Sequence, residues 1–549
     1  MTVSSAVAAH RARRDHDPIP PDLSRQTGTL SKMKQAFGPG TALRAALQMT
    51  GSTYVIYAAG LIVSALIARS IGPDEFGRYS YLVWLAGVLI LVSNNGLTTS
   101  GIRFVSEGLG RGSPEDAANV HGWLLKRQLA CIALVSLLYL VAMPYFRPSG
   151  WESGSLWLFA AIVLVSSTAK TMYLFNISIA KGHGRFDVEA YSAIVISLLN
   201  AIAVVILWWM HAALLAYLIL FAVTCVAYAG YAAMKLRRSG IRARFQPLDA
   251  ALLKRLRHHL LWTVVLTVAA VFSNKSIETW LLNDQIGAAE VAYFTIAAAL
   301  TRGGLDLLSS GLNTVLMPSM AHAFGASGQQ RVNEILSNAL RYFHFLGLML
   351  AGVGVLWSEP AVSLMYGPRY ATVVDLLRIM VVVGGLTLSE GAFGALLSTT
   401  DNQRVRAIFA SLSIVFTAIA AFTLIPTYGL YGAVAAHAIS RMLVFILTLA
   451  GIVRIMSLRL PWREIMLLFA SALVAATVSG VMIWLLPGLW IQLAAGVIYA
   501  LILVGMTLRL RAWNHHDANE VLMLIERYPS ILGWITPTVR RWRDGLEKA

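Results

Sequence analysis

Long apolar runs separated by short polar segments make up most of the chain. Because about 20 helical residues cross the roughly 30 Å of bilayer hydrocarbon, each run of this length is a candidate transmembrane helix. The runs lack the alternation of apolar and polar side chains that strands of a membrane β-barrel show. The pattern predicts an all-α, polytopic integral membrane protein with about fourteen transmembrane helices, over residues 50–69, 80–99, 124–146, 155–176, 188–209, 211–234, 260–282, 289–316, 339–357, 372–398, 407–426, 429–453, 464–486 and 489–508.

Composition strengthens this prediction and narrows the function. Of the 549 residues, 57% are hydrophobic and only 13% are charged, which is more apolar surface than a water-soluble domain buries. Both cysteines, Cys131 and Cys225, fall within apolar runs, and no Cys or His spacing is typical of a metal site. The sequence also lacks the GxxxxGK[ST], GxSxG and HExxH motifs. We therefore expect neither an enzyme nor a bound cofactor or metal.

Lysine and arginine are distributed unevenly between the segments that connect the apolar runs. If the N-terminal segment lies inside, the inner segments hold most of them, with the densest block at 235–259, whereas the outer segments hold only Arg69, Arg78, Arg147 and Arg369. Cytoplasmic loops carry such an excess. We therefore expect an even number of helices with both termini cytoplasmic. The net charge of +17 then reflects topology and attraction to lipid headgroups rather than nucleic-acid binding.

A short motif occurs twice along the chain. The stretches ARSIGPDEFGRYS and IGAAEVAYFT each follow the first helix of a block of six predicted helices, and their alignment pairs Ile71 with Ile286, Gly72 with Gly287 and Glu75 with Glu290. Two blocks in the same orientation predict a parallel repeat, as in transporters built from two homologous bundles. The predicted parts are a disordered basic cytoplasmic arm (1–45), an N-lobe (46–234), a basic cytoplasmic linker (235–259), a C-lobe (260–455), two further helices (456–508) and an amphipathic cytoplasmic tail (509–549).

Ionisable residues within the predicted helices mark the candidate site, because charge inside a bilayer needs a partner or a water-filled cavity. In the run 289–316, Arg302, Asp306 and Asn313 recur at helical spacing and share one face with Ser309. We expect this face to avoid lipid. Alternatively, Arg302 and Asp306 form a local ion pair that only links helices.

Five further positions extend this candidate site. Lys275 and Glu278 lie three residues apart beside Asn274, and these two charges can likewise pair locally. Lys170 has no carboxylate within helical reach and is therefore the strongest candidate for a free cation, unless it extends toward the cytoplasmic end. Glu390 lies deep in the run 372–398.

Three stretches carry a resemblance to a known family. LIARSIGPDEFGRYS, NNGLTTSGIRFVSEGLG and LIPTYGLYGAVAAHAIS resemble the polysaccharide transporter (oligosaccharide flippase) family of the multidrug/oligosaccharidyl-lipid/polysaccharide (MOP) exporter superfamily, over about residues 50–454. The resemblance implies two six-helix lobes around a V-shaped, MATE-like cavity in a bacterial inner membrane. It also implies that undecaprenyl-diphosphate-linked oligosaccharides move from the inner to the outer leaflet for surface polysaccharide, exopolysaccharide or O-antigen synthesis, with a polymerase and glycosyltransferases as partners.

The candidate residues receive roles under this resemblance. Lysine and arginine suit the diphosphate and asparagine the sugar hydroxyls, so the substrate-binding candidates are Lys170, Lys275, Arg302, Asn94, Asn95, Asn274 and Asn313. Coupling of export to protons or sodium through Glu278, Asp306 or Glu390 is a further hypothesis.

Three other functions remain open. A MATE-type drug/cation antiporter shares the architecture but needs a net-acidic cavity, and a lipid II flippase differs only in substrate. A membrane scaffold without transport predicts that loss of Lys170 or Arg302 leaves surface polysaccharide intact.

Overall fold

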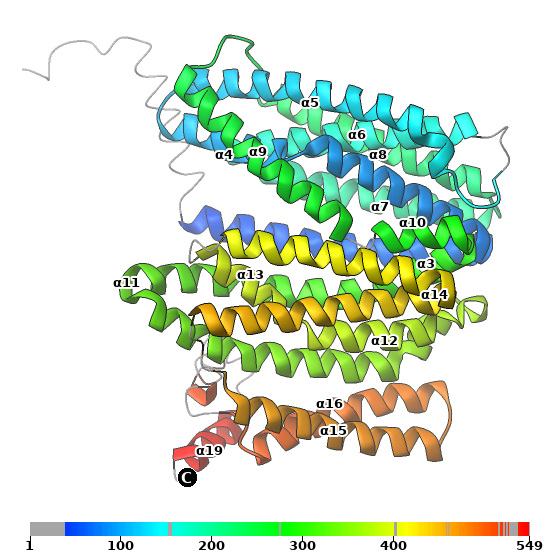
Figure 1. Cartoon of the computed structure of the whole chain (residues 1–549), viewed down its shortest axis with the longest axis vertical. Coiled ribbons are helices and arrows are strands. Elements are labelled where there is room, and N and C mark those ends of the chain that lie inside the picture. Colours follow the sequence, from blue (N-terminus) through cyan, green and yellow to red (C-terminus); the bar gives the residue numbers. More distant parts are fainter. Residues whose placement is uncertain are drawn as a thin grey trace, which may run out of the picture.

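Long helices running nearly side by side make up the described part of the protein (Figure 1). The computed structural model describes residues 39–151, 156–273, 276–399, 403–456, 458, 460–513, 517–519, 522, 525 and 536–547. Within these ranges no residue lies in a strand, and nine helices are long and apolar enough to cross a membrane. The prediction of an all-α polytopic membrane protein is confirmed.

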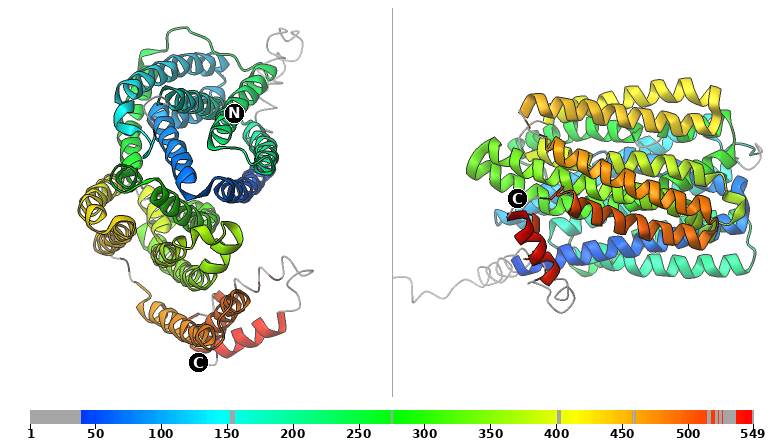
Figure 2. Two further views of the ribbon diagram at one scale, coloured as in Figure 1. Left: turned by 90° about the vertical axis from the view of Figure 1, so that its right-hand side faces the viewer. Right: turned by 90° about the horizontal axis from the view of Figure 1, so that it is seen from below.

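The helices are described in three groups, which follow one another from top to bottom in Figure 1 and are seen end-on in Figure 2, except that the first helix of the second group lies beside helices of the first. The first group, called the N-half, contains α3 (Pro39–Asn94), α4 (Leu97–Gly110), α5 (Pro114–Ala142), α6 (Leu156–Gly182), α7 (Asp187–Trp209) and α8 (Leu214–Arg238). The second, called the C-half, contains α9 (Ala250–Ser273), α10 (Ser276–Gln285), α11 (Ala288–Met365), α12 (Val373–Leu386), α13 (Glu390–Thr399) and α14 (Gln403–Met456). The third contains α15 (Trp462–Leu485), α16 (Leu489–Arg509) and the short α19 (Thr536–Glu547).

Three of these helices each hold two predicted runs joined at a kink. The kinks lie at Gly72 of α3, Gly328 of α11 and Gly429 of α14, with φ of 79°, 69° and 57°. Only glycine adopts this left-handed backbone at little cost. The glycines therefore let the chain reverse from one span to the next without an intervening loop, which is why fourteen runs occupy fewer continuous helices.

The run 372–398 is instead interrupted within the bundle. α12 ends at Leu386 and α13 begins at Glu390, and Thr387 closes α12 by donating from its backbone N–H to Val383 O at 3.0 Å. The sequence is almost continuously apolar here, so the pattern predicts one helix. The interruption exposes backbone polar groups that must find partners inside the protein.

Basic side chains and their partners gather at one end of the bundle, called the basic end. The α6–α7 turn meets the end of α8 there, with Arg185 Nη1 donating to Ser239 Oγ at 2.9 Å. The end of α4 meets the start of α9 through Arg255 and Glu107, whose Nη1 and Oε1 are 2.9 Å apart. These contacts link the inter-helix segments that the sequence predicts to be cytoplasmic.

The opposite end carries exposed aromatic side chains. Tyr145, Trp209, Trp484 and Trp490 lie at the ends of their helices and are largely exposed. Tryptophan and tyrosine concentrate where a bilayer meets water. This end therefore has the character of a membrane interface.

The N-half and C-half are joined at the opposite end. The Tyr370 hydroxyl donates to Ala68 O at 2.7 Å, and Asn283 Oδ1 accepts from the backbone N–H of Ser149 at 2.9 Å. Buried apolar side chains of both halves, including Phe76, pack behind these bonds. The opposite end is thus closed in this conformation.

The two copies of the repeated motif face each other within this closure. A Cβ added at Gly77 would lie 1.7 Å from Ala288 O, so the first copy requires glycine where it meets the start of α11. The aligned glycines differ in conformation, because Gly72 has φ 79° whereas Gly287 has an extended φ of 165°. Only Gly72 therefore needs to be glycine for backbone reasons.

The third group is fastened to α11. Tyr499 of α16 donates from its hydroxyl to Leu348 O at 3.0 Å. Beyond α16, the carboxylate of Asp517 lies 3.0 Å from the guanidinium of Arg341, and both side chains are buried. The C-terminal region is therefore attached to the C-half by a buried ion pair as well as by apolar packing.

Candidate functional site

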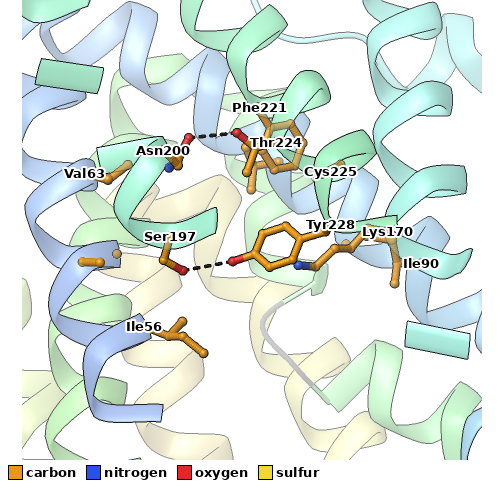
Figure 3. A pocket seen from close by; sticks show the side chains of 14 residues that line it. Ile56, Val63, Ile90, Lys170, Ser197, Asn200, Phe221, Thr224, Cys225 and Tyr228 are labelled. Atoms are coloured by element: carbon orange, nitrogen blue, oxygen red, sulfur yellow. Dashed lines mark hydrogen bonds between the residues drawn. The ribbon is translucent and has the colours of Figure 1, made fainter. Parts of the chain in front are cut away.

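The N-half encloses a pocket among α3, α6, α7 and α8 (Figure 3). The pocket measures about 340 Å³, within the range of small-molecule sites. Residues on both sides of the α3 kink form one wall. Most lining side chains are apolar, and the nitrogen and oxygen atoms come from Lys170, Ser197, Asn200, Thr224 and Tyr228.

Lys170 is held in this pocket by aromatic rings. Its Nζ lies 3.6 Å from the centroid of the Tyr228 ring and 4.5 Å from that of Tyr173. The faces of these rings attract a desolvated cation. The nearby carboxylate of Glu189 is bound to Lys181, with Nζ and Oε2 2.5 Å apart. Ring faces leave the N–H donors of the ammonium group available to an anion.

Two hydrogen bonds between α7 and α8 shape the wall opposite α3. The hydroxyl groups of Ser197 and Tyr228 are 2.9 Å apart, and Thr224 Oγ1 donates to Asn200 Oδ1 at 3.0 Å, as Figure 3 shows. The first bond fixes the ring that holds Lys170. Gly60 and Gly87 have open space where a side chain would lie, so small residues on α3 keep the pocket wide.

The C-half brings its charges together on one face of α14. His437 Nδ1 lies 3.5 Å from Oε1 of Glu278, whose side chain is 1% exposed and whose Oε2 has no hydrogen-bond partner among the described residues. One helical turn further, Arg441 Nη2 lies 3.5 Å from Glu390 Oε2. Residues four apart share a helix face, so two of the predicted coupling carboxylates flank one stripe.

The interruption between α12 and α13 forms part of this cluster. Arg441 Nε donates to Thr387 Oγ1 at 3.0 Å, and Glu390 opens α13. Ser389 between them is buried, and its Oγ has no partner in the described ranges. The interrupted helix therefore places a hydroxyl group and a carboxylate beside one arginine.

Three cations lie at the same depth. Lys170 and Arg302 lie fourteen residues from the opposite-end starts of α6 and α11, and Arg441 lies twelve residues from the Gly429 kink. At 1.5 Å per residue, all three are about 18–21 Å from that end, close to the midplane of a bilayer. Transporters commonly bind substrates at this level.

The other predicted site residues fall in different surroundings. Arg302 is exposed on α11, next to Gly303, where Tyr57 of the N-half packs at 3.9 Å from an added Cβ. Asn94 is buried at the end of α3, and Asn95 follows with a left-handed φ of 42°. The structure thus places Asn94 in helix packing rather than in the pocket.

Four predictions lie outside what the structure describes. Asn274 and Lys275 are not among the described residues, and the side chains of Asp306 and Asn313 are likewise outside the description. Their proposed roles stay predictions.

Sequence reasoning missed Arg441 and the partner of Glu278. Arg441 is a lone charge within the run 429–453, and His437 is a single histidine in the same run. Their partners lie on other helices, which spacing along one helix cannot reveal. A charge in a membrane span is energetically costly without a partner, and this cost is the sequence signal that could have marked Arg441 as a candidate functional residue.

In the described ranges, no group of three or more His, Cys, Asp or Glu side chains is placed to hold a metal ion.

Part of the sequence matches a known protein family. The family described as "Polysaccharide biosynthesis protein" matches residues 42–324, which is just over half of the chain. No curated protein sequence matches it.

Several solved structures share the fold. The inward closed conformation of the lipid II flippase MurJ has a TM-score of 0.66 at 13% identity, over 83% of this chain and 98% of that one. An inward-facing multidrug resistance MATE family transporter of the MOP superfamily has a TM-score of 0.60 at 18% identity, over 74% and 95%. A MOP superfamily transporter from Pyrococcus furiosus has a TM-score of 0.54 at 19% identity, over 78% and 98%.

Proposed function

Because the chain belongs to the polysaccharide biosynthesis protein family, we propose that it is a flippase for lipid-linked oligosaccharides. The proposed substrate is an undecaprenyl-diphosphate-linked repeat unit for surface polysaccharide, exopolysaccharide or O-antigen, supplied by glycosyltransferases and used by a polymerase. The single observation that carries the proposal is Lys170, a mid-membrane ammonium in an N-half pocket, with no carboxylate in direct contact among the described residues. An intramembrane cation of this kind suits a diphosphate.

The proposed movement is alternating access between the two halves. The closed opposite end and the basic end correspond, on this proposal, to the outer and cytoplasmic sides of a bacterial inner membrane, with both termini inside. The headgroup enters from the basic end, binds at mid-depth and leaves when the contacts around Tyr370 separate. The prenyl chain stays in lipid throughout.

The membrane potential favours this direction. With the cell interior negative, export of an anion gains about 2.3 kcal/mol per charge per 100 mV. Coupling to a proton or sodium gradient through Glu278, Glu390 or Asp306 is part of the proposal, and the buried Glu278–His437 contact supports it for Glu278. Flipping at fixed voltage with and without an ion gradient tests the coupling.

The decisive experiment measures flipping directly. Purified protein in proteoliposomes receives fluorescent prenyl-diphosphate saccharide, and a membrane-impermeant quencher reports its leaflet. We expect Lys170→Gln to lower the rate by at least about tenfold, because a charged hydrogen bond to the diphosphate is lost. Lys126→Gln is the matched control, since its Nζ lies 5.0 Å from the Phe245 ring at the basic end. Equal rates for both variants and the unmodified protein would refute the proposal.

A MATE-type cation antiporter is the second candidate. The buried carboxylate of Glu278 favours it, because a cationic substrate needs an acidic partner. Extrusion of a cationic dye that depends on Glu278 and not on Lys170 would support this candidate over the flippase. Preference for lipid II over other prenyl-linked saccharides in the same liposomes would identify a lipid II flippase.

A further inference from the structure

Arg441 lies on the inward face of α14 and yet is partly open to solvent. Its side chain is 37% exposed. Ile439 and Ile446, at 54% and 53% exposure, mark the lipid-facing side, which lies about 140–160° around the helix from Arg441. Val434 and Val444, on the side of Arg441, are buried at 1% and 6%. The exposed area of Arg441 therefore lies on the side of α14 away from the lipid-facing isoleucines.

The donors of this guanidinium are only partly used. Nε donates to Thr387 Oγ1 at 3.0 Å, and Nη2 approaches Glu390 Oε2 at 3.5 Å without a hydrogen bond between them. The structure records no other polar contact of Arg441 with a described residue. Because a guanidinium carries five N–H donors in a planar fork, several donors of Arg441 have no partner among the described residues and can take a second ligand.

The exposed positions beside Arg441 continue along α13. Glu390 is 43% exposed in its side chain, and Gly394, one turn further on, has open space where a Cβ would lie. The neighbouring Ser389 is buried, and its Oγ has no hydrogen-bond partner among the described residues. Arg441, the exposed carboxylate of Glu390 and the open position at Gly394 thus lie along adjoining turns of α14 and α13.

We propose that Arg441 is a second anion-binding site, in the C-half, and that Glu390 occupies it until the substrate arrives. The ligand is a phosphate or carboxylate group, which comes from either the carrier diphosphate or an acidic sugar. This inference rests on the proposed function and extends it, because the substrate anion then contacts Lys170 in one half and Arg441 in the other. Glu390 competes with the substrate anion for Arg441, so Glu390 weakens substrate binding and speeds substrate release.

Competition gives the two partners opposite effects. Loss of Arg441 removes the donor fork and weakens substrate binding. Loss of the Glu390 charge removes the competitor and strengthens substrate binding. A purely structural ion pair behaves differently. Removal of either partner leaves the other charge unpaired in the membrane, so both substitutions lower the stability of the protein.

The test measures flipping rate against substrate concentration in proteoliposomes with two probes. One is a prenyl-diphosphate saccharide of neutral sugars, and the other carries a uronic acid. We expect Arg441→Gln to raise KM by roughly tenfold and Glu390→Gln to lower it. If Arg441→Gln raises KM for both probes, the site binds the diphosphate. If it raises KM for the uronate probe alone, the site binds the sugar carboxylate.

Several controls separate this inference from a folding defect and from the proposed function. Arg378→Gln removes an arginine whose Nη1 lies 3.2 Å from Asp375 near the opposite end, and it should leave KM unchanged. Gly394→Leu fills the space and should raise KM without changing charge. Two outcomes refute the C-half site and leave the flippase proposal standing, provided that the unmodified protein flips both probes. In the first, Glu390→Gln raises KM as Arg441→Gln does. In the second, neither variant changes KM. If the unmodified protein flips neither probe, the proposed function itself fails.

Discussion

Two mid-membrane cations are held by different kinds of neighbour. Lys170 rests against the rings of Tyr228 and Tyr173, which attract its charge without neutralising it. Arg441 stands beside Glu390, a charge that must move before an anion takes its place. Lys170 is therefore ready for a ligand in this conformation, whereas Arg441 becomes ready only through exchange.

At the residue scale, the pocket around Lys170 can be filled without altering charge. Gly60 borders it and has no atom within 4 Å of an added Cβ. We expect Gly60→Leu to fold normally and to lower flipping by at least about tenfold, equivalent to about 1.4 kcal/mol of lost binding. Gly480→Leu on α15 also enters open space and serves as control. Normal flipping by Gly60→Leu would exclude the pocket from the substrate path.

At the scale of elements, prediction from sequence succeeded where hydrophobic length decides the structure. The apolar runs located the helices, and the polar segment between the runs 50–69 and 80–99 coincides with the kink of α3 at Gly72. The interruption between α12 and α13 was not predictable, because Thr387–Ser389 lies in an apolar stretch and tertiary contacts with Arg441 stabilise it. Lys170 could be singled out from the sequence because no carboxylate lies within helical reach of it, whereas Arg441 pairs with Glu390 across distant segments.

The contact between α4 and α9 predicts a pH dependence at the basic end. The Arg255 hydrogen bond holds the pKa of the Glu107 carboxyl below its ordinary value of 4.5, and Arg111 adds to the effect. A lowered folded-state pKa means that the stabilisation is complete above that ordinary value and is lost as pH falls through the lower one.

Thermal unfolding of the purified protein between pH 7 and pH 3 checks this. We expect Tm to fall toward acid in the unmodified protein, and Glu107→Gln to have a lower Tm at pH 7 with less change on acidification. The exposed Glu334, which pairs with Arg331 at 2.5 Å, is the matched control as Glu334→Gln. Parallel pH curves for Glu107→Gln and the unmodified protein would contradict the assignment.

At the scale of the whole molecule, the two halves share a long contact between α3 and α11, closed at the opposite end. Opening there must break the hydrogen bonds of Tyr370 and Asn283. Because one such bond contributes about 1 kcal/mol, a single substitution can change the balance of conformations several-fold.

We expect Tyr370→Phe to increase the population that is open at the opposite end. Spin labels on Asp74→Cys and Asp375→Cys, in a Cys131→Ser, Cys225→Ala background, should show a larger share of long distances. Tyr499→Phe loses a similar buried bond, to Leu348 O at 3.0 Å, without touching the closure. An unchanged distance distribution in Tyr370→Phe would mean that this bond does not hold the end shut.

The buried pair between Arg341 and Asp517 ties the segment just beyond α16 to α11. In the proposed alternating-access movement, α15 and α16 therefore move with the C-half. A nanobody that binds these two helices is a handle on that half, suited to following its rotation in single molecules.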